Sequence, residues 1–94
     1  MPAFREGTRR YGSVERVAVG ATSAQSAAMS GTDEVLLHAT VDCYILAAAD
    51  PTAAATTSIP MAAGEKFHMQ ILPGQKIAVI RATEDGFLYV AQVI

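Results

Sequence analysis

The sequence predicts an all-β fold, a small antiparallel β-sandwich or jelly-roll-like domain with an extended N-terminal arm. From residue 34 onward, apolar and polar residues alternate in short runs, as in strands with one buried face. Turn residues separate these runs at intervals of about 8–12 residues, the spacing typical of β-sandwiches. The 94 residues suit a single core. We expect residues 1–33 to hold the arm, a short strand and a small-residue loop, and residues 34–94 the β-sandwich domain.

The N-terminal third is expected to contain one short strand within residues 12–21. There, Val17 and Val19 fall on one side of the strand and Arg16 on the other. Residues 22–33 combine Ala with Ser, Thr and Gly, which favours an irregular connection over a helix.

Residues 34–47 show the clearest alternation, and we expect two strands that are interrupted near residues 40–42. Asp50-Pro51 then predicts a turn and loop, because proline fixes φ and keeps the preceding residue out of the helical region. The positions expected on the shared apolar face are Leu37, Ala39, Val41, Cys43 and Ile45.

Four further strands are expected in the C-terminal half, at residues 58–61, 66–72, 76–81 and 87–94. Pro60 places the first at a sheet edge, and Phe67, Met69 and Ile71 point inward in the second. The last is apolar on both faces, so we expect it to be central or in a subunit interface. Pro73-Gly74 predicts a type II turn, and residues 84–86 a hairpin with positive φ at its glycine. The residues expected to set turn geometry are Pro51, Gly64, Pro73, Gly74 and Gly86.

Residues that carry chemistry are scattered rather than grouped. His38 and His68 fall on the outer faces of strands and lack the spacing of paired metal ligands. The adjacent acids at residues 33–34 and 84–85 point opposite ways on an extended chain, and Cys43 is expected to be a small buried hydrophobe. We therefore expect no enzyme, no catalytic or metal-binding residue and no cofactor.

Charge and hydropathy indicate a protein partner. The net charge is −2 and the mean hydropathy is +0.27, which for so small a chain predicts apolar surface meant for a partner. Residues 1–16 carry four Arg against two Glu, so this segment suits an acidic neighbour such as a second copy. We expect no nucleic-acid partner and no membrane partner, and synthesis in the cytoplasm.

Residues 35–93 resemble a set of small virion structural proteins of tailed bacteriophages and prophages. The resemblance is carried by ATVDCYI, AAADPTAAATTS, SIPMAAGEKFHM, ILPGQKIAVI and EDGFLYVAQVI. It implies a capsid decoration (cement) protein on the capsid surface of the virion, made in the host bacterial cytoplasm. The implied partners are the major capsid protein and further copies of the chain, as a homotrimer whose N-terminal arm bridges capsomers and stabilises the head. The docking candidates are Phe4, Arg5, Arg9, Arg10, Tyr11 and Arg16.

Two other functions stay open. The chain carries few charges after residue 34, which suits a minor tail, fibre or head–tail-junction β module. A small glycan-binding β domain is the third possibility, with an outer face lined by His38, Tyr44, His68 and Gln70.

Overall fold

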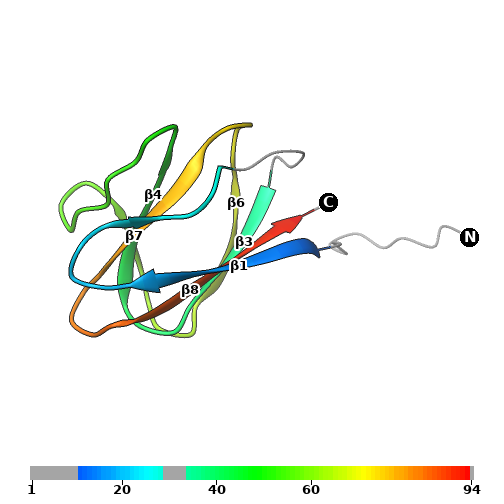
Figure 1. Cartoon of the computed structure of the whole chain (residues 1–94). Coiled ribbons are helices and arrows are strands. Elements are labelled where there is room, and N and C mark those ends of the chain that lie inside the picture. Colours follow the sequence, from blue (N-terminus) through cyan, green and yellow to red (C-terminus); the bar gives the residue numbers. More distant parts are fainter. Residues whose placement is uncertain (1–10, 29–33, 94) are drawn as a thin grey trace, which may run out of the picture.

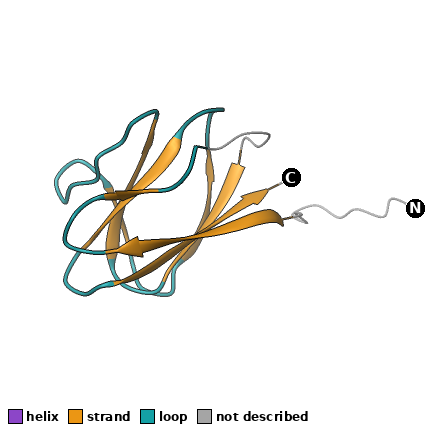
Figure 2. Cartoon of the chain, in the orientation of Figure 1, coloured by secondary structure: helices purple, strands orange, loops and turns teal. Residues whose placement is uncertain are grey.

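A computed structural model describes residues 11–28 and 34–93. Within these residues the chain forms eight strands and no helix (Figures 1 and 2), which confirms the all-β prediction. The strands are β1 (Tyr11–Val19), β2 (Ala24–Gln25), β3 (Glu34–Ala39), β4 (Cys43–Ala48), β5 (Ile59–Met61), β6 (Lys66–Gln70), β7 (Lys76–Arg81) and β8 (Gly86–Val93).

The strands form two antiparallel sheets that stack as a sandwich (Figure 1). Sheet A has the order β1-β8-β3-β6, and sheet B the order β2-β7-β4-β5. The first strand pairs with the last, the second with the seventh, the third with the sixth and the fourth with the fifth. This nesting, with successive pairs placed alternately in the two sheets, is the eight-stranded jelly roll. The sequence left jelly-roll and simpler sandwich topologies open, and the strand pairing decides for the jelly roll.

The core lies between the sheets and uses the residues that alternation placed inward. In β3 every second side chain is buried, and in β4 Cys43 and Ile45 are buried, as predicted, while Val41 in the connection is half-buried. Met69 packs partly buried against the core and Ile71 is fully buried, whereas the Phe67 side chain lies outside the described part of the structure. The largest fully buried side chains include Leu37, Ile45, Ile71, Ile77, Leu88 and Val90.

The N-terminal strand belongs to the sandwich. β1 pairs with β8 from Tyr11 to Val19, and Val17 and Val19 are buried in the core. Residues 11–28 therefore share one two-layer body with residues 34–93, whereas the sequence assigned residues 1–33 to a segment outside the sandwich domain. The reason is strand pairing, since β8 is hydrogen-bonded to β1 on one side and to β3 on the other. β8 is accordingly a central strand of sheet A, one of the two predicted positions.

Two predicted turns have the expected geometry. Gly64 (φ +80°) and Gly74 (φ +84°) both adopt the left-handed backbone region that glycine enters without steric cost. In residues 62–65 and 72–75, the N–H of the fourth residue donates to the carbonyl of the first, at 3.0 and 3.1 Å. Because Pro73 precedes Gly74, the second turn is the predicted type II turn.

The prediction that Gly86 adopts a positive φ in a hairpin is wrong. Its φ lies outside the left-handed region, and the chain there forms no hairpin, because β7 belongs to sheet B and β8 to sheet A. A Cβ atom at Gly86 would lie 2.7 Å from the Thr40 Oγ1 and 2.7 Å from the Val41 methyl groups. Gly86 is required by close packing where the chain crosses between the sheets.

Two prolines occupy the places that their chemistry allows. β5 is an edge strand of sheet B, so Pro60 sits where a missing N–H donor is tolerated, as predicted. Pro51 lies buried in the connection between β4 and β5, and its carbonyl accepts a 2.7 Å hydrogen bond from the Gln25 Nε2. The predicted irregular loop around Pro51 is confirmed.

Candidate interaction surface

The outer face of sheet A gathers exposed apolar side chains. Tyr11 is 45% exposed, Val14 61% and Phe87 38%. Val14 and Phe87 point outward by alternation, since Val17 and Leu88 face the core. Unbroken alternation would put Tyr11 on the same side as Val17, and the register shift between Tyr11 and Val14 brings Tyr11 to the outer face instead. We call this surface the aromatic face and define it by Tyr11, Val14, Arg16, His38, His68, Phe87 and Tyr89.

A cation–π contact joins β1 to β8 on the aromatic face. The guanidinium carbon of Arg16 lies 4.4 Å from the centroid of the Phe87 ring. The register places Arg16 opposite Tyr89 and Ala18 opposite Phe87, so the two residues are diagonal neighbours. Such a contact is worth about 0.5–1 kcal/mol at an exposed site, and it holds the Phe87 ring against the sheet.

Two ring pairs continue the aromatic face across the sheet. His38 and Tyr89 are register partners, and their ring centroids lie 6.2 Å apart with an interplanar angle of 28°. Tyr11 and His68 stack at 6.2 Å and 20°, and the Tyr11 hydroxyl lies 3.0 Å from the His68 Nε2.

The contact between Tyr11 and His68 spans the whole width of sheet A. Tyr11 lies on β1 and His68 on β6, which are the two edge strands of the sheet. Ala91 faces outward from the central strand β8 and is nevertheless only 8% exposed. A small residue at this central position therefore suits the close approach of the larger side chains around it.

The predicted docking residues separate into two groups. Tyr11 and Arg16 lie in β1, on the aromatic face, and so belong to the sheet rather than to an arm. The other docking candidates fall outside the described residues: Phe4, Arg5, Arg9 and Arg10. Sequence reasoning missed Phe87 and Tyr89 as their neighbours, because alternation shows which side chains share a strand face but not which strands are adjacent.

The outer face suggested for a glycan is only partly assembled. His38, His68 and Gln70 lie on sheet A, on β3 and β6. Tyr44 lies on β4 in sheet B. This grouping is therefore wrong in Tyr44, since residues 40–42 carry the chain from one sheet to the other.

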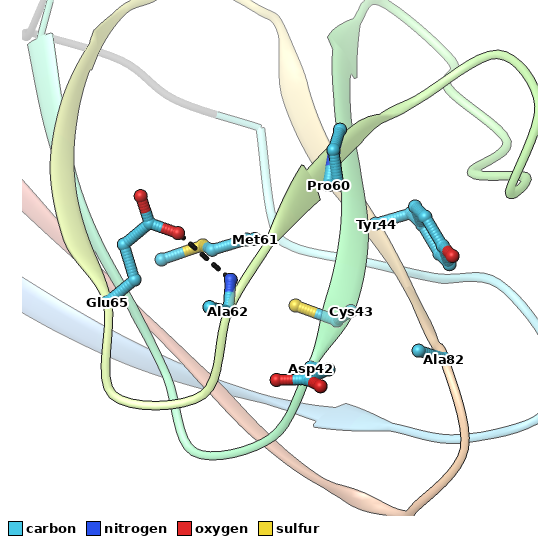
Figure 3. A pocket seen from close by; sticks show the side chains of 8 residues that line it. All are labelled: Asp42, Cys43, Tyr44, Pro60, Met61, Ala62, Glu65 and Ala82. Carbon is cyan, nitrogen blue, oxygen red and sulfur yellow. Dashed lines mark hydrogen bonds between the residues drawn. The ribbon is translucent and has the colours of Figure 1, made fainter.

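A second feature is a hollow of about 390 Å³ at the edge of sheet B (Figure 3). We call it the acidic hollow, and it is lined by Asp42, Cys43, Tyr44, Pro60, Met61, Ala62, Glu65 and Ala82. The Asp42 carboxylate accepts a 2.8 Å hydrogen bond from the Ala63 N–H, and the Glu65 carboxylate a 2.9 Å bond from the Ala62 N–H. Both carboxylates are thereby fixed beside the turn that joins β5 to β6.

The thiol of Cys43 is buried at the base of this hollow. Burial, followed by the charges of Asp42 and Glu65, raises the pKa of the Cys43 thiol to about 11. A thiol with so high a pKa carries almost no thiolate at neutral pH. Cys43 behaves as a buried apolar residue, as the sequence predicted.

Two further structural findings and the comparison with known proteins complete the description of the site. Among the described residues, no group of three or more His, Cys, Asp or Glu side chains is placed to hold a metal ion. The same part of the chain contains no helix that is long and apolar enough to cross a membrane. Comparison with protein-family models, curated proteins and solved structures found no match.

Proposed function

We propose that the chain is a non-enzymatic virion structural protein of a tailed phage or prophage, a capsid decoration protein that binds the capsid surface as an oligomer. The observation that supports this best is the aromatic face, where Tyr11, Val14 and Phe87 are exposed together on one sheet. Aromatic residues and arginine are enriched in protein interfaces and dominate their binding energy. The partner on this proposal is the major capsid protein.

The fold is compatible with this role without deciding it. Jelly rolls occur in viral capsid domains, and also in lectins and cupins, so the topology alone names no function. The turn motifs of residues 35–93 supply the second support, because they resemble those of phage virion proteins. Bound in many copies as trimers, such a domain adds a small binding energy at each site, and the sum of these energies stabilises the head.

The binding test uses particles that lack this protein and purified chain that is added back. Replacing Phe87 with Ala removes the ring that packs under the Arg16 guanidinium, and we expect affinity for the particle to fall by about tenfold or more. Leu72→Ala is the matched control, since Leu72 is 60% exposed in the β6–β7 turn and is not one of the residues that define the aromatic face.

Thermal unfolding of the free proteins verifies that both variants fold. Equal particle binding by Phe87→Ala and Leu72→Ala would refute the aromatic face as the docking surface. Binding that is confined to the tail or to one vertex would favour the tail or head–tail-junction module. Thermal stabilisation by a polysaccharide, without particle binding, would favour the glycan-binding domain.

A further inference from the structure

The acidic hollow has the chemistry of an arginine-binding site. Asp42 and Glu65 supply two carboxylates, and each already accepts a backbone N–H, which fixes its position. Met61 is buried at the base of the hollow and Pro60 forms part of its wall. The Tyr44 ring completes the lining (Figure 3).

Arginine fits this combination better than lysine does. Its planar guanidinium binds carboxylates through paired hydrogen bonds and stacks on aromatic rings. Its aliphatic stem covers apolar surface while the charged end stays at the rim. In the described part of the chain, neither carboxylate is in an ion pair, and the pair that does form joins Arg81 to Asp85.

The chain itself supplies arginines that could bind in the acidic hollow. Residues 1–10 hold three Arg against one Glu, a net charge of +2, and precede the described structure. The described residues 11–28 and 34–93 hold four Lys and Arg against seven Asp and Glu, a net charge of −3. The N-terminal segment and the body of the molecule are therefore complementary in charge.

The position of β1 shows that a copy cannot fill its own hollow with Arg9 or Arg10. Tyr11 pairs with Val93, whereas the hollow lies at the other end of the sheets, where β3 ends and β4 begins. Eight residues of β1 separate these ends, or about 26 Å at 3.3 Å per residue. Arg10 and Arg9 lie one and two residues before Tyr11, so at most about 7 Å of backbone separates them from it, far less than the distance to the hollow.

We propose that the acidic hollow of one copy binds the N-terminal arginines of a second copy, so that each copy gives its first ten residues to a neighbour and receives those of another. This inference rests on the proposed function, because it supplies the contact that would join copies into the oligomer. A head-to-tail contact of this kind closes into a ring when the rotation between copies permits.

The test measures self-association of the full chain by sedimentation equilibrium at low salt. The hollow variant carries Asp42→Asn and Glu65→Gln, which remove the charges and keep the acceptors for the Ala62 and Ala63 N–H groups. The arm variant carries Arg5→Gln, Arg9→Gln and Arg10→Gln. The control is Glu84→Gln, which removes an exposed carboxylate outside the hollow.

We expect the dissociation constant for self-association to rise at least about tenfold in the hollow variant and in the arm variant. The variant that combines both sets of substitutions should self-associate as well as the weaker-associating of the two separate variants. Glu84→Gln should self-associate like the wild type. A hollow variant that associates like the wild type, additive losses in the combined variant, or a wild type that stays monomeric would each overturn the inference. Particle binding is scored separately, so the proposed function and this contact can fail independently.

Discussion

Cys43 combines burial with two nearby negative charges. Its side chain lies on the inner face of β4 and is 2% exposed. Burial first, and then Asp42 and Glu65, raise the pKa of the thiol from 9.0 to about 11. The alternation of residues 34–47 was enough to predict the burial. The acid at residue 65 could not be foreseen, since it reaches Cys43 only through the pairing of β4 with β5.

The raised pKa of Cys43 predicts a loss of stability in alkali. Between pH 9 and pH 11 the unfolded chain releases the thiol proton while the folded chain keeps it, so rising pH favours unfolding. The contribution is fully present below pH 9 and is lost as pH rises through about 11. At 1.36 kcal/mol per pKa unit, the loss amounts to about 2–3 kcal/mol.

Urea unfolding of the wild type and of Cys43→Ala at several pH values measures this effect. Every other side chain is the same in the two proteins, so its contribution cancels in the difference. The wild type should lose about 2–3 kcal/mol more than Cys43→Ala between pH 9 and pH 11. Parallel pH profiles would show that the thiol is not held in its neutral form.

At the level of elements, the regular strands follow from the sequence and the crossings between sheets do not. The strands from β3 to β8 match the predicted alternating runs within a few residues. Sequence reasoning missed β2, which has only two residues. Beyond β2, the pairing with β7 continues at Ser26, whose N–H donates to the Ile77 carbonyl and whose side-chain hydroxyl accepts a 2.9 Å hydrogen bond from the Ile77 N–H. No periodicity in an Ala- and Ser-rich segment signals such pairing.

The crossing at Gly86 gives a prediction about element packing. Gly86→Ala places a methyl group 2.7 Å from Thr40 and Val41. The Phe87 N–H also donates to the Thr40 Oγ1 at 2.9 Å, so the contacting segment is tied in place. We expect a loss of about 1–3 kcal/mol of folding free energy, as for other overpacking substitutions.

Gly20→Ala is the matched control for this substitution. The nearest atom to a Cβ there is the Asp85 Oδ1 at 4.0 Å, an ordinary contact, and φ is not in the left-handed region. Its free energy of unfolding should stay within about 1 kcal/mol of the wild type. If chemical denaturation gives equal losses for the two variants, close packing at Gly86 is not the reason for the glycine.

At the scale of the whole molecule, the jelly roll determines which side chains act together. Sheet A brings Arg16 from the first strand beside Phe87 from the last. Sequence reasoning gave the excess of apolar residues and the two-faced last strand. It could not place the exposed apolar groups on one face, because this depends on contacts between residues about 70 positions apart.

The same topology separates the two proposed contacts. The aromatic face covers sheet A, and the acidic hollow lies at the edge of sheet B. On these two proposals, the contact with the capsid surface and the contact with a neighbouring copy use different parts of the molecule and do not compete. This arrangement suits a protein that covers a lattice, since each bound copy adds to the energy of the whole assembly.

The most direct measurement is the number of copies per purified particle, relative to the major capsid protein, by quantitative mass spectrometry. A capsid decoration protein should be present at a ratio near one, or at a fixed simple fraction of one, set by the capsid lattice. A few copies per particle, or none, would contradict the proposed role on the capsid surface.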